Sequence, residues 1–122
     1  MADFKNLIVF QKAYTLALEA HRVATGIRGA EYLSLKSQII RAANSIPANI
    51  VEGRGQESPK EFARYLRIAI NSTSELEFHL IMAKDLRVIR DSNFSSLLTK
   101  LVQVRKMLHG LRNHIRNSVP TR

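Results

Sequence analysis

Hydrophobic residues recur along four stretches of the chain at alternating intervals of three and four positions. This spacing places their side chains on one side of an α-helix, which turns once in about 3.6 residues. The pattern predicts four helices, at about residues 7–26, 33–54, 59–88 and 92–116. The last is the most regular, because the spacing holds at every step through Phe94, Leu97, Leu101, Val104, Leu108, Leu111 and Ile115. The sequence therefore predicts an all-α protein.

The second predicted helix contains a proline and is followed by the clearest turn signal in the chain. Pro47 removes one backbone hydrogen bond, so we expect a kink, but the hydrophobic pattern continues through it. The segment 53–55, Gly-Arg-Gly, is predicted to end this helix. Ser58 then has the character of an N-cap, with Pro59 at the first helical position and Glu61 completing a capping box.

The first and third predicted helices carry more hydrophobic residues than one buried stripe requires. The surplus includes Phe10 and Tyr14 on the first helix and Tyr65 on the third. We interpret this surplus as a second contact surface, such as a subunit interface. The alternative is that the aromatic side chains fold over the ends of the bundle.

One face of the second predicted helix carries Arg41, Ser45, Ala48 and Glu52, three of which are polar. Arg41 and Glu52 lie about three turns apart, too far to pair with each other along a helix. The expected partner of Arg41 is therefore Glu75 or Glu77 on the third helix. We interpret these charges as interhelical or intersubunit ion pairs, and a polar functional site is the alternative.

The formal net charge of +9 is concentrated in the last third of the chain. Residues 87–122 hold eight Lys or Arg against one acid, Asp91, whereas residues 1–86 hold eleven against nine. A basic stripe on the last helix consists of Arg105, His109, Arg112 and Arg116. Such a concentration favours a polyanionic partner, with nucleic acid as the first candidate. The alternative is that the charge only confers solubility and complements the helix dipole.

Other features of the sequence narrow the class of protein. The absence of cysteine excludes disulfides and thiolate metal sites, and no nucleophile, phosphate-loop or metal-ligand motif occurs, so we expect neither an enzyme nor a cofactor. No apolar run is long enough to span a membrane and the N-terminus does not resemble a signal peptide, so we expect a cytoplasmic protein. The 122 residues suit a single domain, with a frayed tail at about 117–122.

Several motifs, in order along the chain, resemble those of one known family. They are Val9–Ala13, the segment SQIIRAANSIPANIVEG at residues 37–53, Ser58–Phe62 and Ser74–Glu77. Together they are similar to the four-helix bundle proteins encoded within intervening sequences of bacterial large-subunit ribosomal RNA genes. The resemblance extends over residues 4 to about 112, with Phe10 where the family usually has Trp.

This resemblance implies an antiparallel up-down-up-down four-helix bundle that assembles into a homopentamer. It offers no catalytic or cofactor-binding residues, and a related branch, the accessory protein of diversity-generating retroelements, binds reverse transcriptase and nucleic acid. Two hypotheses follow. The first is a non-enzymatic oligomer that binds RNA or DNA through Arg105, Arg112 and Arg116. The second is an assembly scaffold that recruits a protein partner without physiological nucleic-acid binding.

Overall fold

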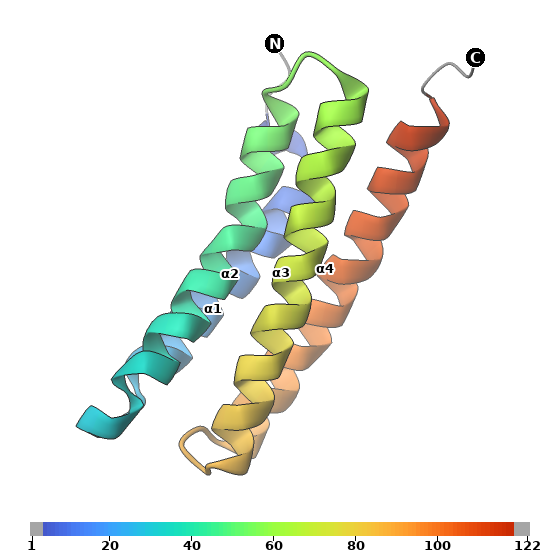
Figure 1. Ribbon diagram of the computed structural model, residues 1–122. Helices are drawn as coiled ribbons and strands as arrows, with labels where there is room; N and C mark the ends of the chain where they lie inside the picture. Colours follow the sequence, from blue (N-terminus) through green and yellow to red (C-terminus); the bar gives the residue numbers. More distant parts are fainter. Residues whose placement is uncertain (1–3, 119–122) are drawn as a thin grey trace.

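The computed structural model describes residues 4–118, which form four long α-helices and no strand (Figure 1). The helices are α1 (Ile8–Thr25), α2 (Leu33–Arg54), α3 (Pro59–Asp85) and α4 (Asp91–Asn117). Two short 3-10 turns, η1 (Phe4–Asn6) and η2 (Ala30–Tyr32), precede α1 and α2. The all-α class and the four helices predicted from the hydrophobic spacing are confirmed.

Consecutive helices run in opposite directions, so the bundle has the up-down-up-down arrangement (Figure 1). The most extensive helix contact joins α2 to α3, and a smaller contact between α4 and α1 closes the bundle. Helices α1 and α3 do not meet within the described residues and therefore occupy opposite corners. Each turn between helices is short, as expected for antiparallel neighbours.

All four helices contribute to one hydrophobic core. The residues at the predicted three–four spacing are the ones that lose solvent contact, because they share the inward side of each helix. The largest fully buried side chains are Leu16, Ile39, Ile46, Ile50, Leu66, Leu76, Leu80, Leu97, Leu101 and Leu108. Each would contribute about 1.5–3 kcal/mol by leaving water.

Helices α2 and α3 approach closely at Gly53. A Cβ atom at this position would lie 2.8 Å from Cδ1 of Phe62 and 2.9 Å from Cβ of Tyr65. The predicted end of this helix within residues 53–55 is confirmed, since α2 continues through Gly53 to Arg54 and Gly55 caps it. Gly53 is needed for packing against α3. The helix is also continuous through Pro47, as predicted.

The start of α3 agrees with the predicted N-cap but not with the complete capping box. Ser58 Oγ accepts a hydrogen bond from the backbone N–H of Glu61, 3.4 Å away. The Glu61 carboxylate, however, accepts from Nε of Arg64, 3.0 Å away and one turn further along the helix. Glu61 is therefore engaged along its own helix.

The end of α3 comes three residues earlier than predicted, at Asp85. Arg87 adopts a left-handed backbone with φ of 61°, which no helix can continue. The backbone N–H of Val88 donates to the carbonyl of Ala83 over 3.1 Å, and that of Arg87 donates to the carbonyl of Lys84 over 2.9 Å. This is a Schellman motif. No glycine marks this motif in the sequence and hydrophobic residues continue beyond it, so the predicted helix is too long.

The C-terminal helix ends later than predicted. Asn117 is the last residue of α4, and Ser118 caps it by donating from its hydroxyl to the carbonyl of Ile115 over 2.6 Å. Residues 117 and 118 therefore belong to the ordered helix end. The remainder of the predicted frayed tail, residues 119–122, lies outside the described residues.

The contact at Gly53 leads to a stability prediction. Gly53→Ala should lower the free energy of unfolding by about 1–3 kcal/mol, because the added methyl overlaps the Phe62 ring and Cβ of Tyr65 on α3. Gly110→Ala is the matched control, since nothing lies within 4 Å of its Cβ position on α4. That change should stabilise the protein by up to about 1 kcal/mol through helix propensity. Urea unfolding measures both, and equal effects of the two changes would contradict the packing role of Gly53.

Candidate nucleic-acid interface

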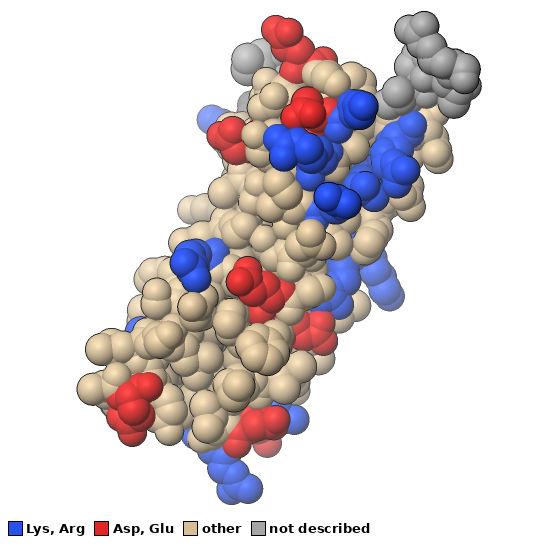
Figure 2. Space-filling model, viewed as in Figure 1, with Lys and Arg blue, Asp and Glu red and all other residues tan. Residues whose placement is uncertain are grey.

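A basic groove lies between the first half of α3 and the last turns of α4. Its volume is about 480 Å³, and its lining residues are Lys60, Glu61, Ala63, Arg64, Arg67, Arg112 and Arg116. Five of these seven residues are basic. Figure 2 shows Lys and Arg side chains gathered at this end of the molecule, where α3 begins and α4 ends. We refer to this feature as the basic groove.

Helical spacing brings the basic residues of the groove together. Lys60, Arg64 and Arg67 follow one another at intervals of four and three, so they share one side of α3. Arg112 and Arg116 share one side of α4 in the same way, and the antiparallel contact of α3 with α4 sets the two rows beside each other. The single acid, Glu61, is paired with Arg64. The groove therefore keeps an excess of positive charge.

Arg112 is the most enclosed cation of the groove. Its Nε donates to the backbone carbonyl of Ala63 over 3.2 Å, which ties the last turns of α4 to α3. Burial lowers the pKa of Arg112, and the positive charges of Arg116 and Arg67 lower it further. The fold thus holds Arg112 close enough to Arg116 and Arg67 to be repelled by both.

Arg105 occupies a different environment from the rest of the predicted basic stripe. Its Nε donates to the hydroxyl of Thr73 over 3.0 Å, and its terminal nitrogen lies 2.6 Å from Glu77 Oε1. Arg105 is therefore committed to an ion pair between α4 and α3. His109 is exposed and does not line the groove, whereas Arg112 and Arg116 do. Of the basic stripe predicted from the sequence, Arg112 and Arg116 thus line the groove and Arg105 and His109 do not.

Arg41 does not pair with an acid of α3 in the same chain, so this prediction is wrong for contacts inside one subunit. Arg41 donates to Oε1 of Gln38 over 2.6 Å on its own helix, and Glu77 pairs with Arg105 instead. Glu52 and Glu75 are exposed. The reason is the rotation of α3, which turns Glu77 towards α4 and away from α2. Pairing of these charges between subunits stays a prediction.

The contact of that polar face of α2 with α3 is instead made by hydroxyl groups. The hydroxyls of Ser45 and Ser72 lie 2.7 Å apart and share a hydrogen bond. Asn49 supports this contact from α2 by donating to the backbone carbonyl of Ser45 over 2.8 Å. Ser72 and Thr73 are buried, so small polar residues in the middle of α3 allow its two neighbours to come close.

The predicted interface aromatics are only partly exposed. Phe10 packs against the core, makes an edge contact with Phe4 and stacks with Tyr14 at a centroid distance of 5.9 Å. Tyr14 is 51% exposed, while Tyr65 is half-buried beneath the Arg64 guanidinium. Phe10 therefore packs onto the bundle while Tyr14 remains on the surface, and a subunit interface there stays a prediction.

Further large hydrophobic side chains are exposed on α1, at the start of α2, on α3 and just after its end. They are Ile8, Leu18, Leu33, Phe78, Ile81, Met82 and Leu86. Phe78 is 57% exposed and is not among the surface aromatics predicted from the sequence. Its position outside the buried stripe of α3, next to Glu77, was the available signal.

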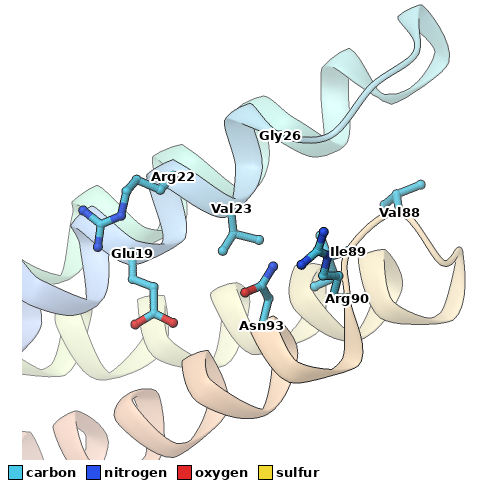
Figure 3. Close-up of a pocket in the computed structure, with 8 residues that line it drawn as sticks. All are labelled: Glu19, Arg22, Val23, Gly26, Val88, Ile89, Arg90 and Asn93. Carbon is cyan, nitrogen blue, oxygen red and sulfur yellow. The ribbon is translucent and has the colours of Figure 1, made fainter.

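A second hollow, of about 470 Å³, lies at the opposite end of the bundle between α1 and the turn that precedes α4 (Figure 3). Val23 and Asn93 point into it from opposite walls, while Arg22 extends away along α1. Its carboxylate, Glu19, is already bound to Lys100 and to the Ser96 hydroxyl of α4. This hollow therefore presents an ion pair to solvent and holds no arrangement of nucleophile and base.

The hydrogen bonds of Glu19 determine how it titrates. Burial by itself would raise the pKa of Glu19, but the hydrogen bonds from Lys100 and Ser96 and the charge of Lys100 outweigh it. The pKa is lowered as a result, and Glu19 is ionised at neutral pH.

Neither a metal centre nor a membrane span was found in the part of the chain that the structure describes. Residues 4–118 contain no group of three His, Cys, Asp or Glu side chains placed to hold a metal ion. Within the same range, no helix combines the length and the hydrophobicity needed to cross a bilayer.

The fold and the groove define a basic four-helix bundle protein with a cationic surface groove. Comparison with protein families shows that the chain belongs to the 23S rRNA-intervening sequence proteins, whose family model matches residues 5–110. The family resemblance inferred from the sequence motifs is therefore confirmed. The family description names no enzymatic activity.

A solved structure shares the fold. It is a crystal structure from Bacteroides thetaiotaomicron of a protein described as having unknown function and belonging to the S23 ribosomal protein family. The two chains are 23% identical with a TM-score of 0.81, over 86% of this chain and 98% of the other. A comparison with curated proteins gives no match.

The Glu19 contacts lead to a prediction for stability against pH. Glu19→Gln should cost roughly 0.5–1 kcal/mol of unfolding free energy at pH 7, because the partly exposed pair with Lys100 is lost. The lowered pKa means that this contribution is present above the unfolded-state pKa of about 4.3 and disappears as the pH falls through the folded-state pKa. The difference between the variant and the wild type should therefore shrink by pH 3.

Urea unfolding at pH 7 and pH 3 measures this difference. Glu75→Gln is the control, because Glu75 is exposed on α3. The interpretation of Glu19 fails if its substitution costs the same at both pH values.

Proposed function

We propose that this protein is a non-enzymatic, cytoplasmic RNA-binding protein that holds the phosphate backbone in the basic groove. The observation that carries the proposal is that five basic side chains from two helices face one groove whose single acid is already paired. Guanidinium groups suit phosphate because their planar donors match its oxygens. The binding residues are Lys60, Arg64, Arg67, Arg112 and Arg116. Arg105 is left out because it does not line the groove and is held between α4 and α3 by Glu77 and Thr73.

The chemistry of the groove favours recognition of the backbone over recognition of bases. Tyr65, the aromatic residue next to it, already lies 4.6 Å beneath the guanidinium carbon of Arg64. Base stacking on aromatic rings is therefore a small part of the proposed binding, and little sequence preference is expected. RNA is proposed before DNA because the family name refers to 23S ribosomal RNA.

Removal of two groove charges should weaken RNA binding. We expect Arg67→Gln combined with Arg116→Gln to reduce the affinity for a labelled single-stranded RNA and to reduce its dependence on salt. Each lost phosphate contact should lower the slope of log affinity against log salt by roughly 0.7. Fluorescence anisotropy of nuclease-treated protein over a salt series measures both quantities, with a DNA oligonucleotide of the same sequence as a second probe.

The control removes the same charge from the other end of the bundle. Arg22→Gln with Arg90→Gln changes two cations that line a hollow of similar volume, so the net charge of the two double variants is equal. Affinity and salt slope should stay near the wild-type values. Equal losses in both variants would mean that binding follows net charge alone. Absence of wild-type binding would favour the scaffold hypothesis, which capture of a protein partner after nuclease treatment would test.

The protein is also proposed to assemble with copies of itself. Tyr14 and Leu18 lie four residues apart on one side of α1, and Phe78 and Met82 repeat this spacing on α3. Because α1 and α3 occupy opposite corners, the two exposed hydrophobic surfaces face different directions. Contact between the α1 surface of one copy and the α3 surface of the next is heterologous and closes into a ring when the rotation fits. A pentamer is the number implied by the family resemblance.

Two charge substitutions test the assembly. Leu18→Glu and Phe78→Glu should each reduce the mass measured by light scattering, because a buried carboxylate disrupts an apolar contact. Each variant keeps one intact surface, so an equal mixture should form dimers through the remaining α1–α3 contact. Gln103→Glu is the control, because it adds the same charge to an exposed position of α4, outside the proposed contact. A monomeric wild type, or a mixture in which no dimer forms, would contradict heterologous assembly.

A further inference from the structure

Arg112 differs from Arg64 and Arg105 in the group that accepts its hydrogen bond. Its Nε donates to the carbonyl of Ala63, a neutral acceptor, and no carboxylate pairs with it among residues 4–118. Arg105 and Arg64, by contrast, each pair with a carboxylate, from Glu77 and Glu61. Because a guanidinium is planar, fixing Nε also restricts the plane of the two terminal nitrogens. Arg112 is therefore oriented by the fold and keeps its charge unneutralised.

The neighbours of Arg112 make this lone charge unfavourable. Arg112 is only partly exposed as a whole residue, and the like charges of Arg116 and Arg67 act on its guanidinium. Arginine does not escape by losing its proton, since its pKa stays far above neutral. An anion beside it would remove the repulsion and replace the lost solvation. The arrangement thus favours an anion at one particular point of the groove.

A structural role for Arg112 explains less of what is seen. The hydrogen bond from Nε to the Ala63 carbonyl joins α4 to α3, and the stem of a long side chain often packs along such a contact. That role accounts for the burial of its stem, but it does not require two further arginines on the same side. Arg105, seven residues earlier on the same helix, shows how the fold neutralises an arginine that only joins the helices.

We propose that Arg112 is the primary phosphate site of the groove, where its terminal nitrogens bind two oxygens of one phosphodiester and Arg67 and Arg116 contact the same group. This assignment rests on the proposed function and specifies the ligand chemistry of its site. Lys60 and Arg64 would contact adjacent phosphates, because Lys60 and Arg67 lie about 10 Å apart along α3. The groove of about 480 Å³ accommodates a short length of backbone.

Substitution by lysine separates geometry from charge. Arg112→Lys keeps the positive charge but removes the planar pair of donors and the Nε bond to Ala63. We expect about a tenfold loss of affinity for the single-stranded RNA probe with little change in the salt slope. Arg116→Lys is the matched control on the same helix, and a loss of threefold or less is expected there. Thermal unfolding shows whether either variant remains folded.

A second measurement uses the wild-type chain and does not depend on any variant folding. The Nε–H resonance of Arg112, followed by NMR during titration with inorganic phosphate and then with the RNA probe, should shift in both titrations. RNA should act at lower phosphate concentration, because neighbouring groups bind at the same time. A shift with inorganic phosphate without RNA binding would support the phosphate site and overturn the RNA proposal.

Other outcomes would reject the phosphate site at Arg112 but leave the proposed RNA binding intact. Equal losses for the two lysine variants, or an Arg112 resonance that no phosphate moves, would overturn the special role of Arg112. The RNA proposal would still stand in that case if the Arg67 and Arg116 double variant lost binding while the Arg22 and Arg90 control did not.

Discussion

The close approach of α2 to α3 is the constraint on which the rest of the structure depends. Gly53 leaves no room for a side chain against α3, and the hydroxyls of Ser45 and Ser72 meet 2.7 Å apart further along the same contact. Two contacts separated along the helices fix the rotation of α3 about its own axis. That rotation turns Glu77 towards α4 and places the carbonyl of Ala63 next to the end of α4. The surface chemistry of the α3–α4 side is therefore set by packing on the α2–α3 side.

The cations of α4 have different roles along its length. In the middle of the helix, Lys100 pairs with Glu19 of α1 and Arg105 pairs with Glu77 of α3. Partly exposed pairs of this kind add little net stability, but they define how the helices are aligned. Towards the C-terminus no acid of the described residues pairs with Arg112 or Arg116. The negative end of the helix dipole offsets part of the repulsion among these cations, and the rest is what a bound anion would relieve.

The helices are well predicted from the sequence because the buried side of a helix makes hydrophobic residues recur every three or four positions. Ser58 is recognisable as an N-cap because capping depends on residue types close together in the chain. The turn at Arg87 is not recognisable, because its left-handed residue is not glycine. The site is less accessible from sequence. Arg105 and Arg112 lie on the same side of α4, and they differ only in the group of α3 that each one meets. The alignment of α3 with α4 determines that group. The same alignment also brings Lys60, Arg64 and Arg67 to the groove.

The outward side of α3 carries two kinds of surface in succession. Its first half presents the cations Lys60, Arg64 and Arg67, and its second half presents Phe78 and Met82. The proposed RNA contact and the proposed contact between copies therefore use separate turns of one helix and do not compete. A +9 subunit repels its copies, so assembly requires the hydrophobic contact to exceed that repulsion. Bound phosphate reduces the repulsion, and several grooves on one particle raise the affinity for a long strand, so each proposed activity favours the other.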